Sequence, residues 1–127
     1  MSVGYSGTPL PRKLGIKEGS RVALVDPPAD FELDAQTVPL GSDLDVIVFF
    51  VDELLELEAR FDELAALLVP AGGLWIAWPK RSSGVPTDLS DNVVREVGLA
   101  HGLVDNKVCA ITEVWSGQRF VRRLRDR

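Results

Sequence analysis

The fold of this 127-residue chain is decided by one stretch, Asp45-Val46-Ile47-Val48-Phe49-Phe50-Val51. Six consecutive apolar residues follow the aspartate, without the alternation of a strand that has one wet face. Such a continuous run is typical of a strand buried on both faces, as in a parallel sheet. The run is much shorter than the about 20 residues that cross a bilayer, so it predicts a core strand and no membrane span.

The residues after this strand have the periodicity of an amphipathic helix. Asp52 stands where an N-cap residue would accept a hydrogen bond from the first turn. Apolar residues then recur at helical spacing on one face: Leu54, Leu57, Phe61, Leu64 and Leu68. Residues 70–73, Pro-Ala-Gly-Gly, predict the end of the helix and a turn into a strand over 74–78.

The flanking sequence predicts further elements of the same kinds. They are a short helix over 8–15, a strand over 21–25, a second amphipathic helix over 88–100, and two strands over 103–113 and 118–123 joined around 115–117. Pro27 and Pro28 follow the strand over 21–25 and end it, because proline cannot donate to a ladder. The segment 31–40 is weakly patterned and allows only a short strand around Thr37 and Val38.

The order of these elements predicts the fold class. Strand, helix, strand, helix, strand is the order of a parallel sheet with covering helices, whose crossovers are right-handed almost without exception. The last two strands would add an antiparallel hairpin at the edge. We therefore expect residues 1–127 to form one three-layer, Rossmann-like α/β domain with a mostly parallel sheet.

The composition excludes several kinds of site. With 46% hydrophobic and 26% charged residues, the chain is globular rather than disordered. Its single Cys excludes an internal disulfide, and with a single His it excludes the usual Cys/His zinc sites, so we expect no metal. No charged stretch leads into an apolar core near the N-terminus, so we expect no secretory signal and a cytoplasmic protein.

Charge is segregated along the chain, whose formal net charge is −5. Residues 1–25 carry +3, residues 26–63 carry −11 and residues 119–127 carry +4. Nucleic-acid binding depends on clustered Lys and Arg that neutralise phosphates. Because the rest of the chain is acidic and no nucleic-acid-binding motif accompanies the arginine-rich end, we interpret that end as a solvated final strand and not as a nucleic-acid site.

Two resemblances follow from these elements. The buried strand, the leucine-rich helix and residues 67–76 (Leu-Leu-Val-Pro-Ala-Gly-Gly-Leu-Trp-Ile) resemble the second half of class I, Rossmann-like methyltransferases, over residues 44–124. In that fold a similar turn leads into another strand, another helix and a terminal antiparallel hairpin. The motifs at 5–10, 78–80 and 105–111 also resemble an uncharacterised bacterial family of small proteins, a domain of unknown function, which implies no activity.

The chain departs from the methyltransferase pattern at the turn after its first strand. Those enzymes bind S-adenosylmethionine with a Gly-rich turn there, where bare backbone approaches the ligand. Here the turn contains Asp26, Pro27 and Pro28, and proline adds bulk and removes a donor. Only 17 residues, 27–43, then precede the central strand, too few for two crossovers of about 10–12 residues each. We therefore expect the adenosine-binding half to be missing and no cofactor to be bound.

Open parallel sheets bind ligands beyond the carboxyl ends of their strands, which predicts where a site would lie. The ends of the three parallel strands bring five polar or aromatic residues to one edge: Asp26, Asp52, Trp78, Lys80 and Arg81. Lys80 and Arg81 could hold an anionic ligand, with Trp78 as a stacking wall; the alternative is a solvated loop behind core tryptophans. Asp26 and Asp52 could act as paired carboxylates, although an N-cap is the favoured interpretation of Asp52.

The same rule argues against catalytic residues. His101 follows a helix and is expected at the opposite edge, out of reach of Ser82 and Ser83. Cys109 lies in the middle of a strand, where a small buried apolar residue is expected rather than a reactive thiol. Residues 5–8 are expected at the carboxyl edge, because the short helix must run back before the first strand.

We therefore expect a non-catalytic module that binds a partner protein or a small anionic ligand on a degenerate methyltransferase-like scaffold. The alternative is a small divergent enzyme, a methyltransferase or a hydrolase using Asp26 and Lys80, which rests on the fold analogy. A terminal hairpin leaves an open sheet edge, so a homodimer is a further expectation. The sequence names neither the ligand nor the partner.

Overall fold

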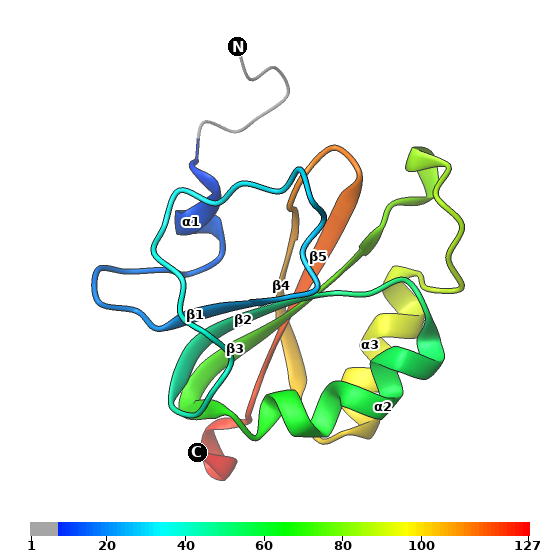
Figure 1. The fold of residues 1–127 in the computed structure, drawn as a ribbon. Coiled ribbons are helices and arrows are strands. Elements are labelled where there is room, and N and C mark those ends of the chain that lie inside the picture. The colour runs from blue at the N-terminus through cyan, green and yellow to red at the C-terminus, as the bar shows by residue number, and fades with distance from the viewer. Residues whose placement is uncertain (1–7) are drawn as a thin grey trace.

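The structure, a computed structural model, describes residues 8–127. A five-stranded sheet runs through the middle of these residues (Figure 1). The strands are β1 (Val22–Val25), β2 (Leu44–Phe50), β3 (Leu68–Pro79), β4 (Val104–Ala110) and β5 (Trp115–Val121), in the spatial order β1-β2-β3-β5-β4. β1, β2 and β3 pair in parallel, and β5 pairs antiparallel with both β3 and β4. The predicted α/β fold, mostly parallel with an antiparallel hairpin at its end, is confirmed.

Helices α2 (Leu54–Ala65) and α3 (Asp91–Ala100) lie on one face of the sheet (Figure 1). Their apolar sides and that face of the sheet enclose the larger of two cores, which contains the fully buried rings of Phe49, Phe61 and Phe120. α3 begins at Asp91, later than the predicted 88, because Ser90 Oγ accepts a hydrogen bond of 3.3 Å from a backbone N–H of the first turn and caps the helix.

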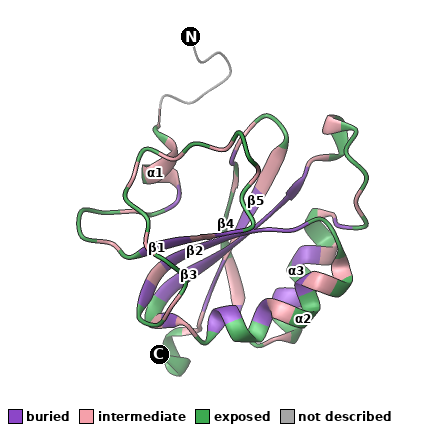
Figure 2. Cartoon of the chain, in the orientation of Figure 1, coloured by how far each residue is buried: buried purple, intermediate pink, exposed green. Residues whose placement is uncertain are grey.

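The opposite face is covered by α1 (Leu10–Lys13) and by the segment 26–43, which contains no helix or strand. Side chains from this layer pack on the second core, which includes Val46, Val48 and Trp75 of the sheet. The covering side chains are Leu10, Leu14, Ile16, Phe31 and Leu33. Figure 2 shows the central strands largely buried between the two layers, so β2 has the two dry faces that its sequence predicts.

The short helix α1 is tied to the sheet at its C-terminal end. Gly15, with a φ of 81°, takes the left-handed conformation that ends the helix, and the backbone hydrogen bonds around it form a Schellman motif. The buried indole Nε1 of Trp75 donates a hydrogen bond of 3.0 Å to the carbonyl oxygen of Leu14. The chain therefore passes from α1 to the amino edge of the sheet, the edge at which the parallel strands begin.

The two edges of the sheet differ in how they are covered. Beside β1, Val38 N donates to Val22 O over 2.8 Å, so the segment 26–43 protects part of that edge. This bond is what the structure has in place of the short strand expected around residues 37–38. β4 forms the other edge, where Val108 is 61% exposed. Such an open edge is where a second copy could pair, and the homodimer stays a prediction.

Residues 70–73 lie inside β3 and not in a turn before it. α2 already ends at Ala65, and Leu68 begins the strand instead of closing the helix. The register of β3 against β2 shifts at these residues, so they form a bulge in the strand. A Cβ on Gly72 would lie 3.0 Å from the carbonyl oxygen of Leu44. The close approach of two backbones, and not a turn, therefore explains the glycine.

The hairpin turn lies at residues 111–114, before the predicted 115–117. Thr112 sets its position, because its Oγ1 accepts hydrogen bonds of 3.1 and 3.0 Å from two backbone N–H groups that follow it. Gly117, interpreted as a turn residue, lies within β5. A Cβ there would lie 2.8 Å from Ile111 Cγ1, so packing requires this glycine as well.

The arginine-rich end folds back onto the domain. Arg122 donates from Nη2 to the carbonyl oxygen of Ala65 over 2.7 Å and from Nη1 to that of Val69 over 3.3 Å. Two single-turn 3₁₀ helices, η1 (Arg81–Ser83) and η2 (Leu124–Asp126), complete the described elements. Among residues 8–127, the helices are all too short or too polar to cross a membrane.

The close approach of α3 to β5 predicts the effect of one substitution. A Cβ on Gly98 would lie 2.8 Å from Cζ of the buried Phe120 ring. We expect Gly98→Ala to lower the free energy of unfolding by about 1–3 kcal/mol, because overpacking outweighs the better helix propensity of alanine. Urea unfolding measures the change, and Glu96→Ala, on the exposed side of the same helix, should stay within about 0.5 kcal/mol. Unchanged stability of Gly98→Ala would contradict this packing.

Candidate functional site

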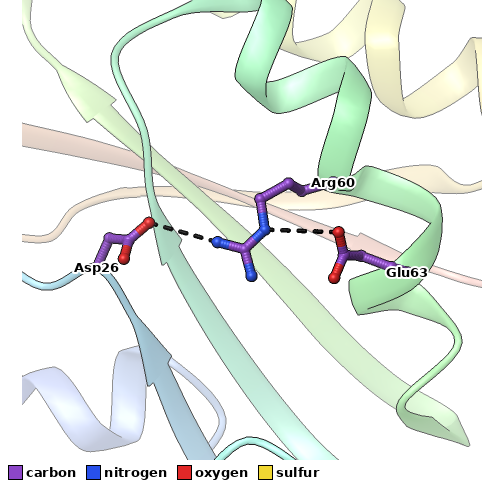
Figure 3. Close-up of polar contacts among 3 residues, drawn as sticks. All are labelled: Asp26, Arg60 and Glu63. Atoms are coloured by element: carbon purple, nitrogen blue, oxygen red, sulfur yellow. Dashed lines mark hydrogen bonds and ion pairs between the residues drawn. The ribbon is translucent and has the colours of Figure 1, made fainter.

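The turn after β1 is built around Asp26, one of the predicted ligand residues. Asp26 takes a left-handed conformation, with a φ of 54°, which aspartate tolerates better than most residues. Its Oδ2 lies 3.4 Å from Arg60 Nη1, and Arg60 Nε lies 3.6 Å from Glu63 Oε1 (Figure 3). The guanidinium also lies over the ring of Phe49, 5.3 Å from its centroid. Asp26 therefore faces α2 and positions Arg60.

Aromatic side chains fill the other face of the sheet beside this turn. Phe31 packs on Phe50, the last residue of β2, with ring centroids 4.8 Å apart, and Phe50 packs edge-on against Trp115 at 5.2 Å. Phe31 belongs to the glycine-free stretch 26–40, which crosses from β1 toward β2 without a helix. Side chains, rather than bare main chain, therefore surround the carboxyl ends of β1 and β2.

A cavity of about 460 Å³ lies at the carboxyl end of β3, beside the start of α3. This carboxyl-edge cavity is lined by Trp78, Lys80, Arg81, Leu89, Asp91 and Ser116, among others. Trp78 is almost fully buried, Lys80 is half-buried and Arg81 is exposed. Lys80 N donates to a carbonyl oxygen of the hairpin turn over 2.7 Å, which holds the loop against β5. Three of the five predicted ligand residues thus line one cavity.

Asp52, the remaining predicted residue, lies in a separate, shallower cavity with the loop before α3. The prediction that it caps α2 is wrong. The N-cap residue is Glu53, whose side chain makes no capping bond, and Leu54 N donates instead to Asp88 Oδ1 over 2.8 Å. Asp52 offers its backbone carbonyl to Thr87 Oγ1 over 2.6 Å. A loop side chain that is 34 residues from Leu54 therefore takes the capping position.

Carboxylates gather around Asp52 and not between the two predicted aspartates. Oxygens of Asp52, Glu53 and Glu56 lie within 4.8 Å of one another, a spacing at which a divalent cation could bind. Asp52 and Glu53 are exposed, and exposed acidic groups are common without an ion. Asp26 is paired with Arg60 instead. The structure therefore does not bring Asp26 and Asp52 together in any of the cavities described.

His101 lies where the sequence predicts, whereas Cys109 is less buried than expected and lies near the end of β4. His101 is at the C-terminal end of α3, and its Nδ1 lies 2.8 Å from Asp62 Oδ1. Cys109 is half-buried on the face covered by α1. Burial raises the pKa of the Cys109 thiol, and Lys13 and Lys107 oppose this with a smaller lowering effect. The thiol thus has cations nearby that the sequence pattern did not reveal, but burial outweighs them.

A second cavity at the carboxyl edge lies on the face covered by α1. It has a volume of about 390 Å³ and lies between Thr8, Phe31 and Thr112. Thr8 thus reaches the edge expected for residues 5–8, and residues 5–7 lie outside the described part of the chain. The charged side chains around this cavity are Lys13, Asp30 and Glu32, so it has no surplus of positive charge for an anion.

The structure also forms a basic cavity that the sequence pattern does not predict. This amino-edge cavity, of about 330 Å³, is lined by Lys13, Lys17, Lys107 and Arg119 together with Asp45. The sequence signal for it was the positive charge at both ends of the chain. Positions 17 and 119 are far apart in sequence, and only the folded sheet brings them to one place.

Comparison with solved structures relates the fold to methyltransferases. The magnesium protoporphyrin IX methyltransferase of Synechocystis PCC 6803 with bound SAM matches 66% of this chain and 41% of its own, with a TM-score of 0.51 and 14% identity. LepI in complex with SAM matches 90% of this chain and 39% of its own, with a TM-score of 0.53 and 12% identity. This chain thus spans less than half the length of either protein. At such identities the likeness shows the fold alone, a Rossmann-like methyltransferase fold.

Sequence comparisons add no closer relative. No family model matches this chain, and no curated protein matches it. The resemblance to an uncharacterised bacterial family therefore has no family model behind it. The resemblance of residues 44–124 to the second half of class I methyltransferases agrees with the fold of the similar structures.

The cap supplied by the loop predicts different effects at two aspartates. Asp88→Ala removes the acceptor of Leu54 N, and we expect it to lower the free energy of unfolding by about 1 kcal/mol, the usual cost of a lost cap. Asp52→Ala removes no capping bond and should change stability by less than about 0.5 kcal/mol. Urea unfolding of both variants measures these changes. A larger loss at Asp52 than at Asp88 would contradict the assignment of the cap.

The surroundings of Cys109 predict its reactivity. Because burial raises the pKa of the thiol, it stays protonated through neutral pH, and iodoacetamide should alkylate it more slowly than free cysteine. Lys107→Gln removes one of the two cations that oppose this shift and should raise the pKa further. The pH dependence of the alkylation rate measures the thiol pKa in the unchanged protein and in Lys107→Gln. A thiol pKa below that of free cysteine would show that the cations, and not burial, dominate.

Proposed function

We propose that this chain is a non-catalytic binding module on a methyltransferase-like scaffold, and that it binds small anionic ligands without using S-adenosylmethionine. The observation that carries the proposal is that side chains fill the turn after β1. Asp26 is paired there with Arg60, and Pro27 and Pro28 follow it. Phe31 then covers the end of β2.

A methyl donor bound in the usual way would need backbone donors and space at this turn. Proline has no N–H, so two successive donors are missing at positions 27 and 28. S-adenosylmethionine would also have to displace Phe31 from its contact with Phe50. That contact contributes apolar burial and an aromatic pair interaction of about 0.5–1.5 kcal/mol. Sterics and packing therefore both oppose the binding of this cofactor here.

The carboxyl-edge cavity is the site that we propose for the ligand. Open α/β sheets bind ligands beyond the carboxyl ends of their strands, and its volume of about 460 Å³ is typical of small-molecule sites. Lys80 and Arg81 supply two positive charges against the negative charge of Asp91, whereas Trp78 is only 5% exposed and packs in the core, as the alternative interpretation expected. The two cations favour a small anion.

A divergent methyltransferase is the second candidate function. The magnesium protoporphyrin IX methyltransferase and LepI, which have a similar fold, contain SAM in their structures. The catalytic residues under this alternative would be Asp26 and Lys80, and a hydrolase would use the same pair. The alternative is weakened because Asp26 is paired with Arg60 on the α2 face and does not line the cavity of Lys80.

Calorimetric titrations with S-adenosylmethionine and ATP test the proposal. We expect no saturable binding of S-adenosylmethionine at concentrations up to about 1 mM. ATP should bind, because its phosphates match the two cations of the cavity. Lys80→Gln and Arg81→Gln should each weaken ATP binding by about twofold to fivefold, the effect of losing one solvent-accessible charge. Arg125→Gln removes an arginine whose side chain is 78% exposed, and it should leave ATP binding unchanged.

Three results would overturn this proposal. Micromolar binding of S-adenosylmethionine, or methyl transfer that is lost in Asp26→Ala and Lys80→Ala, would establish the divergent enzyme instead. ATP binding that is unchanged in both Lys80→Gln and Arg81→Gln would remove the carboxyl-edge cavity as the ligand site.

A further inference from the structure

The amino-edge cavity gathers cations from both ends of the chain, at the opposite end of the sheet from the carboxyl-edge cavity. Lys13 and Lys17 come from α1 and the turn after it, Lys107 from β4 and Arg119 from β5. Asp45 is the single acidic residue among the described lining residues, and its Oδ2 already accepts a backbone hydrogen bond of 2.8 Å. A surplus of three positive charges therefore faces a space of about 330 Å³, in a chain whose net charge is −5.

Gly73 of β3, which has no side chain, leaves the space in which the Arg119 guanidinium lies at this cavity. Its guanidinium lies over Gly73, where a Cβ would be 2.7 Å from Arg119 Cζ and 2.8 Å from Nη2. A larger residue at position 73 would push the guanidinium away. Gly72, the preceding residue, lines the cavity itself. Gly73 therefore makes room for the arginine, and Gly72 lies beside it in the lining of the cavity.

The Arg119 guanidinium has hydrogen-bonding capacity that the described residues do not use. Its Nε is buried and has no acceptor among residues 8–127. The ion pairs formed within the same residues do not include Arg119. Burial and the neighbouring Arg127 both lower the pKa of Arg119, as expected for a cation without an anionic partner. A bound anion would compensate both effects.

Local hydrogen bonds hold the lysine-bearing segments at the same cavity. Lys107 Nζ donates to the carbonyl oxygen of Lys13 over 2.7 Å and so ties β4 to the end of α1. Lys17 begins a tight turn, in which Lys17 N donates to Ser20 Oγ over 2.9 Å and Ser20 N donates to Lys17 O over 3.0 Å. A ligand would therefore meet a largely formed site, which lowers the entropic cost of binding.

We propose that the amino-edge cavity binds a phosphoryl group, as free phosphate or as a small phosphate monoester. The surplus of positive charge favours a dianion over the single charge of a carboxylate. The planar fork of Arg119 matches phosphate oxygens, and the lysines add point charges. Val46, Val69 and Ala71 line the cavity beside the cations and would accommodate the carbon skeleton of an ester. The site does not depend on the carboxyl-edge cavity or on the function proposed for it.

Titrations with inorganic phosphate, ribose 5-phosphate and ribose test this site at low ionic strength. Both phosphates should bind, more weakly as salt is added, and ribose should not. Arg119→Gln should weaken the binding of the phosphates by about tenfold or more, the effect of losing a charged hydrogen-bond donor. Lys17 lies on an exposed turn, so its charge can be removed without unfolding the protein. Lys17→Gln should weaken binding of the phosphates by about twofold to fivefold. Arg125→Gln removes the same charge outside the cavity and should have no effect.

Amide NMR spectra of the same titrations locate the ligand. The signals of Lys17, Gly72 and Gly73 should shift on addition of either phosphate. Tighter binding of ribose 5-phosphate identifies the monoester as the preferred form, and tighter binding of inorganic phosphate identifies the free ion; both support the proposal. The proposal would be overturned by amide signal shifts confined to Trp78 and Lys80. It would also be overturned by equal losses of phosphate affinity in Arg119→Gln and Arg125→Gln, or by binding of ribose alone. These readouts are independent of the S-adenosylmethionine and ATP experiments.

Discussion

The burial of β2 on both faces is the constraint on which the rest of the structure depends. Val46, Val48 and Phe50 face one core, and Ile47 and Phe49 face the other. Each face must be covered, because uncovered apolar strands cost free energy in proportion to the area left in water. α2 and α3 cover one face. On the other face the short helix α1 and the irregular segment 26–43 supply the covering side chains, without a long amphipathic helix.

This irregular cover also reaches the carboxyl edge of the sheet. Phe31 reaches Phe50 at the carboxyl end of β2, close to the turn in which related folds hold their cofactor with bare main chain. The contact that completes the second core therefore also occupies that region. Asp26 at the same turn is committed to Arg60 on the other face. The chain therefore shares the sheet of a Rossmann-like methyltransferase fold, and side chains fill the space at the carboxyl ends of β1 and β2.

The glycines explain where the pattern of the sequence misled. Gly72 and Gly117 follow or precede residues typical of turns, so they predicted turns at 70–73 and 115–117. In the structure both lie within strands, where a Cβ would meet a backbone oxygen or a buried side chain. A glycine required by a turn and a glycine required by a close neighbour look the same in one sequence, since the neighbour is distant along the chain. Gly15, whose requirement is a local φ of 81°, was predicted correctly.

The sequence by itself determined the element order, the doubly buried central strand and the unusual proline turn, because these depend on residues within a few positions of one another. It also placed Trp78, Lys80 and Arg81 together, since they follow one strand. Only the tertiary structure decided the cap of α2 by Asp88 and the meeting of Lys17 with Arg119. The first depends on the loop before α3 reaching the start of α2, and the second on the fold bringing the turn after α1 beside β5. Local periodicity carries no information about such approaches, so the basic cavity could be found only in the folded chain.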